Sequence, residues 1–182
     1  MIGHLRPISN FEELEKLPHL RKVFDSTVPP VVIFPVSHAV GLSVTRCLEK
    51  ENVPILALDF KPRSAGLFSR RVSSVLIPEM YSSPDRFEEW MLRIGSLFRE
   101  RPVLFLVDDE DLFLSLKHAD RWQKYYRLPL SPWKVVSGIV NKAKFYRALK
   151  KANFPVPETW DTSSLARLKA QKAKIRFPCI LL

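Results

Sequence analysis

The 182-residue sequence contains few of the residues that build covalent or metal-stabilised frameworks, with only two cysteines and four histidines. Cys47 and Cys179 lie far apart, and neither belongs to a CxxC pair. A disulfide framework needs several cysteines, and a structural zinc site needs paired cysteine or histidine ligands. The sequence therefore predicts neither kind of site, and we expect both thiols to be small buried hydrophobic side chains.

Long hydrophobic runs are also missing. No stretch approaches the roughly 18 consecutive apolar residues of a membrane-spanning helix, and residues 1–10 lack the charged and then apolar layout of a signal peptide. With 46% hydrophobic residues, the chain can still bury one sizeable core and part of a second domain. These features predict a cytoplasmic protein without a membrane partner.

Acidic residues are scarce relative to basic ones, 19 against 29, which gives a net charge of +10. The excess is local, because residues 141–182 carry ten lysines and arginines against Glu158 and Asp161, a charge of +8. Proteins that bind single-stranded nucleic acids combine such charge with stacking aromatic residues, and no repeated pattern of that kind is present. We expect the charge not to signify nucleic-acid recognition, and a basic interaction or nucleic-acid module is kept as a competing interpretation.

Continuous apolar runs rich in β-branched residues predict strands that are buried on both faces, as in a parallel sheet. Such runs occupy residues 31–36, 54–59, 72–77 and 103–107. Apolar residues at helical spacing lie between and before them, over 11–24, 42–52 and 84–98. Pro18 interrupts the first helix, and Ser83 with Pro84 marks the start of the third. This alternation indicates an α/β fold with a Rossmann-like, doubly wound parallel sheet in which residues 31–36 are central.

Ligands of such sheets bind beyond the carboxyl ends of the strands. The loop after the first strand contains Ser37, His38, Gly41 and Ser43. Its single glycine does not make the G-x-G-x-x-G fingerprint, so we expect no dinucleotide site. Two interpretations stay open: the following helix binds a substrate or anion through its free amide groups, or a serine caps the helix while Gly41 lets it pack close to the sheet. His38 fits a loop residue better than a catalyst.

Carboxylates end the second and fourth strands. Asp59 occupies the place of the acidic residue that binds ribose in Rossmann enzymes, but without the glycine loop we favour a structural capping role. The run 108–111 places four carboxylates at a helix start, where they complement the helix dipole. Asp109 from this run is a candidate member of the same substrate or anion loop.

The last third of the chain carries the most specific pattern. Asn141-Lys142 opens a helix, Asn153-Phe154-Pro155-Val156-Pro157-Glu158-Thr159 follows it, and a strand-like Phe177-Pro178-Cys179-Ile180-Leu181-Leu182 comes last. This succession resembles the entrance to an ATP-grasp domain, which reads Asp-Lys, then Gly-Ile-Pro-x-Pro-x-Thr, then a Phe/Tyr-Pro-hydrophobic strand ending in lysine. Asn141 replaces the aspartate and Asn153 the glycine. Asparagine can cap a helix and tolerates the left-handed conformation, so both replacements are compatible with the pattern.

The resemblance extends upstream and covers most of residues 31–182. The order of Ser37–Ser43, Pro54–Phe60, Gly66–Arg71 and Asp108–Glu110 is similar to that in the preATP-grasp region of carbamoyl-phosphate-synthase-like and D-aspartate-ligase-like proteins. It implies an N-terminal helical extension (1–30), a preATP-grasp Rossmann-like domain (31–138) and an incomplete start of an ATP-grasp α+β domain (139–182).

The family implies ATP and Mg²⁺ as cofactors and a small carboxylate as substrate, which is phosphorylated and then attacked by an amine or similar nucleophile. The position that matches the family's phosphate-binding lysine is Lys142. The family's second lysine, glycine-rich loop and magnesium ligands would follow Leu182, so we expect the 182 residues alone to be catalytically inactive. A homo-oligomer is compatible with the sequence. The remaining alternative is a non-catalytic nucleotide- or anion-binding Rossmann-like module.

Overall fold

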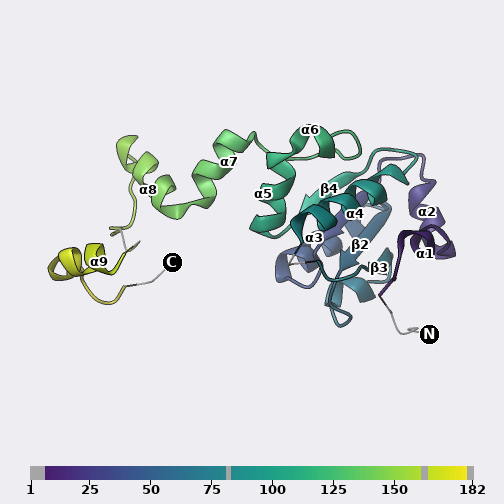
Figure 1. Cartoon of the computed structure of the whole chain (residues 1–182), viewed down its shortest axis with the longest axis horizontal. Coiled ribbons are helices and arrows are strands. Elements are labelled where there is room, and N and C mark those ends of the chain that lie inside the picture. Colours follow the sequence, from purple (N-terminus) through teal and green to yellow (C-terminus); the bar gives the residue numbers. More distant parts are fainter. Residues whose placement is uncertain (1–6, 81–82, 161–163, 180–182) are drawn as a thin grey trace. The chain divides into compact units, whose positions relative to one another are not determined.

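The computed structural model describes residues 7–80, 83–160 and 164–179. The chain divides into two compact units, Met1–Leu130 and Ser131–Leu182. Figure 1 shows strands and helices in the first unit and helices in the second. Each unit is described by itself below.

A four-stranded sheet forms the centre of the first unit. Its strands are β1 (Val31–Phe34), β2 (Ile55–Asp59), β3 (Val72–Leu76) and β4 (Val103–Leu106), in the order β3-β2-β1-β4. All three strand pairs are parallel. Every residue of β1 and β2 is buried, which explains why their sequences are apolar except for Asp59 at the end of β2. The α/β class, the parallel sheet and the internal position of β1 are thus confirmed.

Helices connect the strands and precede the sheet. The N-terminal segment contains α1 (Phe11–Glu15), the 3-10 turn η1 (Pro18–Leu20) and α2 (Arg21–Phe24), so the expected helix is split at Pro18. The later elements of the first unit are α3 (Ala39–Glu49), η2 (Ala65–Phe68), α4 (Pro84–Ser96), α5 (Asp109–Lys117) and α6 (Ala119–Trp122).

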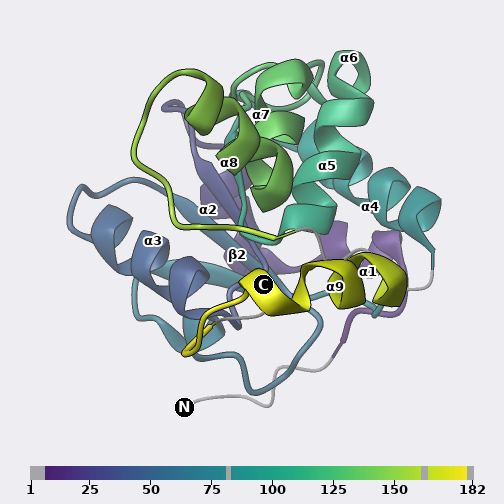
Figure 2. The same ribbon diagram turned by 90° about the vertical axis from the view of Figure 1, so that its left-hand side faces the viewer.

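The two faces of the sheet are covered differently. Figure 2 shows α3 on one side of the sheet and α4 with α5 on the other. The α4 side carries the larger core, in which Phe34, Phe87 and Trp122 belong to one cluster with α1 and α2 side chains. The α3 side carries a smaller cluster of aliphatic residues around Ile33 and Ala57. The sheet is therefore a buried middle layer, and its strand ends are the places where ligands can reach it.

The second unit contains α7 (Trp133–Val140), α8 (Lys142–Lys151), α9 (Leu165–Gln171) and the 3-10 turn η3 (Lys172–Lys174). Helices α7 and α8 contact each other. None of its described residues is buried, and large apolar side chains are exposed at Trp133, Val135, Ile139, Phe154, Leu165, Leu168 and Phe177. Within the described residues, this unit therefore has no core of its own.

Two expectations differ from the structure. Cys47 and Cys179 are both exposed. In α3 it is Gly41 and Thr45 that are buried, and this orientation turns Cys47 outward. Residues 177–179 form no strand, because no described segment pairs with them; positions 180–182 of the expected strand lie outside the described residues. None of the helices described is long and apolar enough to cross a membrane.

Candidate ligand site at the carboxyl edge of the sheet

The loop from β1 to α3 brings the first group of candidate residues to the strand ends. Helix α3 begins after His38, whose side chain makes no capping hydrogen bond. The Ser43 hydroxyl donates to the Ala39 carbonyl oxygen at 2.8 Å, inside the helix. Ser37 Oγ is buried and has no hydrogen-bond partner among the described residues. Neither serine therefore caps α3, and Ser37 is left with an unused polar atom.

Gly41 allows α3 to approach the sheet closely. A Cβ atom at Gly41 would lie 2.4 Å from the Pro35 carbonyl oxygen and 2.9 Å from Val36 Cα. Gly66 makes a similar approach, because a Cβ there would lie 2.5 Å from Val36 Cβ. Val36, which follows the cis Phe34–Pro35 peptide, is thus packed between Gly41 and Gly66. This geometry supports the packing interpretation of Gly41.

His38 faces the loop that follows β4. Its Nε2 atom lies 3.5 Å from Asp108 Oδ1, and the two side chains are 49% and 31% exposed. Strands β1 and β4 are neighbours, so their carboxyl ends bring these residues together. The pair places a partly solvated imidazole beside a carboxylate at the edge where ligands of parallel sheets bind.

Asp59 ends β2 and is completely buried. Its Oδ1 atom accepts a hydrogen bond from the Lys61 backbone N–H at 2.9 Å, a local turn that supports the structural role we favoured. The second oxygen, Oδ2, has no partner among the described residues. Asp59 therefore stabilises the turn that follows β2, and its burial keeps it from binding a ligand at the surface.

Asp111 is the residue of this edge that the sequence did not single out. It lines a small pocket of about 70 Å³ with Glu110 and Leu114 of the same helix and with apolar side chains from three other segments, namely Phe60, Met80, Pro84 and Phe87. Burial, followed by the negative charges of Asp108 and Glu110, raises the pKa of Asp111 to about 7. Asp109 is exposed and is not among the side chains that line this pocket.

A helical projection could have identified Asp111. Leu114 and Ser115 follow it by three and four positions, and Ser115 is buried, so Asp111 shares the inward face of α5. Among the described residues, no three His, Cys, Asp or Glu side chains converge as a metal site. What the edge offers is one carboxyl whose pKa is raised to about 7 and one imidazole–carboxylate pair.

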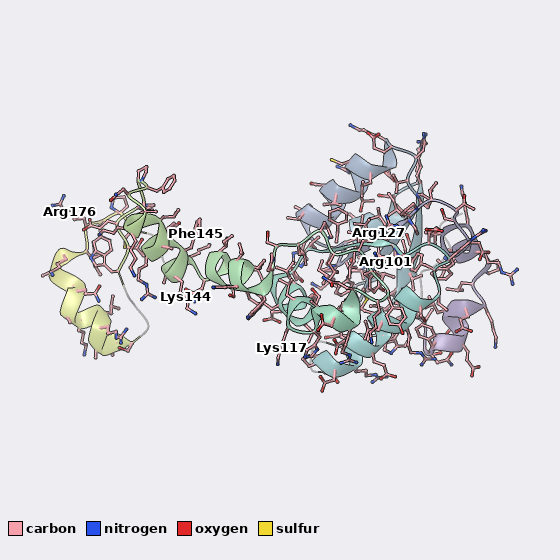
Figure 3. All side chains as sticks on the ribbon, turned by 90° about the horizontal axis from the view of Figure 1, so that it is seen from above. Arg101, Lys117, Arg127, Lys144, Phe145 and Arg176 are labelled. Carbon is pink, nitrogen blue, oxygen red and sulfur yellow. The ribbon has the colours of Figure 1, made fainter. Side chains whose placement is uncertain are left out.

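In the second unit, Lys142 is the first residue of α8 and is exposed. Asn141 caps this helix, because its side chain accepts a hydrogen bond from the Lys144 N–H at 3.0 Å. Asn153 follows the helix with a φ of 60°, in the left-handed region. Both asparagines thus adopt the local conformations expected from the sequence. Lys144 and Phe145 leave α8 in different directions, one toward each side of the ribbon (Figure 3).

Comparisons of the chain with protein-family models, with curated proteins and with solved structures found no match.

Proposed function

We propose that this chain is the N-terminal part of an ATP-grasp ligase, which activates a small carboxylate as an acyl-phosphate for attack by an amine or a similar nucleophile. The observation that carries the proposal is the local geometry of α8. Asn141 caps the helix, Lys142 occupies its first turn, and left-handed Asn153 ends it before Pro155-Val156-Pro157. This arrangement follows a four-stranded parallel sheet, in the order that the family resemblance implies.

The first turn of α8 is suited to a phosphate group. The free N–H groups and the positive end of the helix dipole attract anions, and the ammonium group of Lys142 adds a full positive charge. No acidic residue lies in that turn. Lys142 would thus contact the phosphates of ATP, while bound Mg²⁺ would offset the charge of the transferred phosphoryl group.

Lys142 alone cannot supply tight binding. An exposed lysine contributes about 1 kcal/mol or less toward a phosphate in water, whereas micromolar affinity needs about 8 kcal/mol. The remaining contacts would come from further elements of the nucleotide domain. The exposed apolar side chains of the second unit support this view, because Trp133, Ile139 and Phe154 present a surface on which such elements can pack.

Within the first unit, the carboxyl edge of the sheet is the candidate position for a small carboxylate. Ligands of parallel α/β sheets bind at the carboxyl edge, where His38, Asp108 and Asp111 lie in this chain. A carboxyl that is neutral part of the time can donate a hydrogen bond to a substrate carboxylate, which an ionised aspartate cannot do. We therefore place the carboxylate substrate at this edge.

Calorimetry with ATP and Mg²⁺ tests the proposal. Three proteins are compared: the 182-residue chain, a longer protein that also carries the remainder of the proposed ATP-grasp domain, and that longer protein with Lys142→Ala. We expect micromolar binding only in the longer protein and a loss of about fivefold in the variant, which corresponds to about 1 kcal/mol. Lys150→Ala, which removes an exposed lysine from the last turn of the same helix, is the matched control.

Micromolar binding by the 182 residues alone, or unchanged affinity after Lys142→Ala, would show that the nucleotide site is elsewhere. Release of ADP that depends on an added carboxylate and amine would separate a ligase from a non-catalytic nucleotide-binding module.

A further inference from the structure

A second and larger pocket lies at the opposite edge of the sheet. Its volume is about 400 Å³, within the range of roughly 300–1,000 Å³ that small-molecule sites occupy. It is formed by the amino ends of β2 and β3, the end of α3 and part of α2. Its lining residues are Lys22, Val23, Glu49, Asn52, Val53, Pro54, Ile55, Arg70, Arg71, Val72 and Ser73. The strand exits described above contribute none of them.

Arg71 is held in place at the wall of this pocket. Its Nη1 atom donates to the Glu49 carbonyl oxygen at 3.2 Å and to Asn52 Oδ1 at 3.1 Å. Its backbone N–H donates to Glu49 Oε1 at 3.3 Å. The end of α3 thus orients the guanidinium group, and the Arg71 charge offsets that of Glu49. One edge of the planar guanidinium is left to bind a ligand.

Two further cations in the lining have no such partner. The side chains of Lys22 and Arg70 make no hydrogen bond or ion pair with any other described residue. Because Arg71 already offsets Glu49, the pocket retains an excess of two positive charges. The rest of its wall is mixed: Asn52 and Ser73 are polar, and Val53, Ile55 and Val72 at the strand ends are apolar.

We propose that this pocket binds a small organic phosphate monoester. A phosphate monoester carries a charge of about −1.5 to −2 at neutral pH, which matches the two unpaired cations, whereas a carboxylate would balance only one. Arginine forks also suit the oxygen geometry of phosphate. The phosphate would contact Lys22, Arg70 and the free edge of Arg71, and the apolar body of the ligand would pack on Val53 and Val72. The site is independent of the proposed ligase chemistry, and its test does not require ATP.

Titration of the 182-residue chain by NMR and calorimetry tests the proposal with three probes: phenyl phosphate, inorganic phosphate and benzoate. We expect phenyl phosphate to bind most tightly, since it alone offers both the dianion and an apolar body. Its binding should shift the amide signals of Asn52, Val53, Val72 and Ser73 and should weaken as salt screens the exposed cations. Signals around His38 and Asp108 should stay in place.

Variants then assign the contacts. Arg70→Ala and Lys22→Ala should each weaken phenyl phosphate binding by about three- to tenfold, since each removes one exposed charge–charge contact. Arg86→Ala makes the same change in net charge at an exposed position in the first turn of α4, outside the pocket lining, and should leave the affinity unchanged. Urea unfolding of each variant shows that the fold is retained.

Several outcomes would overturn the proposal. If Arg86→Ala weakened phenyl phosphate binding as much as Arg70→Ala or Lys22→Ala, net charge alone would attract the anion. Equal binding of all three probes would show that the pocket selects neither the dianion nor the apolar body. Absence of shifts at millimolar phenyl phosphate, or shifts confined to the carboxyl edge, would show that the amino-edge pocket binds no phosphate ester.

Discussion

Glu88 and Trp122 form a buried hydrogen bond, in which the Trp122 indole Nε1–H donates to Glu88 Oε1 at 2.8 Å. Glu88 is 1% exposed and Trp122 is fully buried. The same carboxylate lies 2.8 Å from His118 Nδ1 and accepts from Arg121 Nη1 at 2.6 Å. One carboxylate of α4 therefore fixes the turn between α5 and α6, and through it the end of the first unit.

Replacing Glu88 should destabilise the first unit. Glu88→Gln keeps the size of the side chain but removes the charge and leaves at least one of its three donors, of which Trp122 is buried, poorly paired, for which we expect a loss of about 1–3 kcal/mol in the free energy of unfolding. Urea denaturation followed by tryptophan fluorescence measures it. Glu89→Gln, at the neighbouring exposed position of the same helix, is the control; equal stability of the two variants would contradict a structural role for this carboxylate.

Asp111 should make stability depend on pH in the opposite sense to an ordinary paired carboxylate. Its pKa is raised from 3.8 to about 7 in the fold, chiefly by burial. The folded state therefore binds more protons than the unfolded state between these values, and stability falls as pH rises from about 4 to 7. At pH 8 the Asp111 carboxyl is mostly ionised in the folded state, and burying its charge lowers the free energy of unfolding.

Asp111→Asn removes that penalty, so this variant should be more stable than the wild type at pH 8 and nearly equal to it below pH 4. Thermal unfolding across this range measures the difference. Asp109→Asn, at an exposed position in the first turn of the same helix, should show no such pH-dependent difference from the wild type. A constant difference between Asp111→Asn and wild type at every pH would mean that Asp111 does not titrate in this window.

The features that the sequence predicted are those set by local patterns. Continuous apolar runs identified β1 and β2, because a strand buried on both faces is apolar at nearly every position, with Asp59 at the end of β2 as the exception in these two strands. The cap at Asn141 depends on a hydrogen bond to a residue three positions away, which spacing alone reveals. Such features need no knowledge of tertiary packing.

The features that it missed depend on segments distant in the sequence. His38 and Asp108 meet only because β1 pairs with β4. The hydrophobic periodicity of a sequence does not reveal the order of strands in a sheet. The Asp111 pocket needs Phe60 and Met80 from other loops. The exposure of Cys47 depends on which face of α3 packs on the sheet, and Gly41 decides that face by its close approach.

The close approach at Gly41 yields a paired prediction with Gly138. A Cβ at Gly41 would lie 2.4 Å from the Pro35 carbonyl oxygen, a backbone atom that cannot rotate away, whereas a Cβ at Gly138 would meet no atom within 4 Å. Both glycines lie in helices, α3 and α7. Alanine has the better helix propensity at either site by about 1 kcal/mol, so any loss at Gly41 reports the steric clash.

We expect Gly41→Ala to lower the free energy of unfolding of the first unit by about 1–3 kcal/mol, as overpacking does, because α3 must move away from the β1 exit. Gly138→Ala should instead increase the helicity of the second unit. Urea denaturation and circular dichroism measure the two effects. If Gly41→Ala were as stable as the wild type, α3 would have to sit farther from the sheet, and the placement of His38 beside Asp108 would need revision with it.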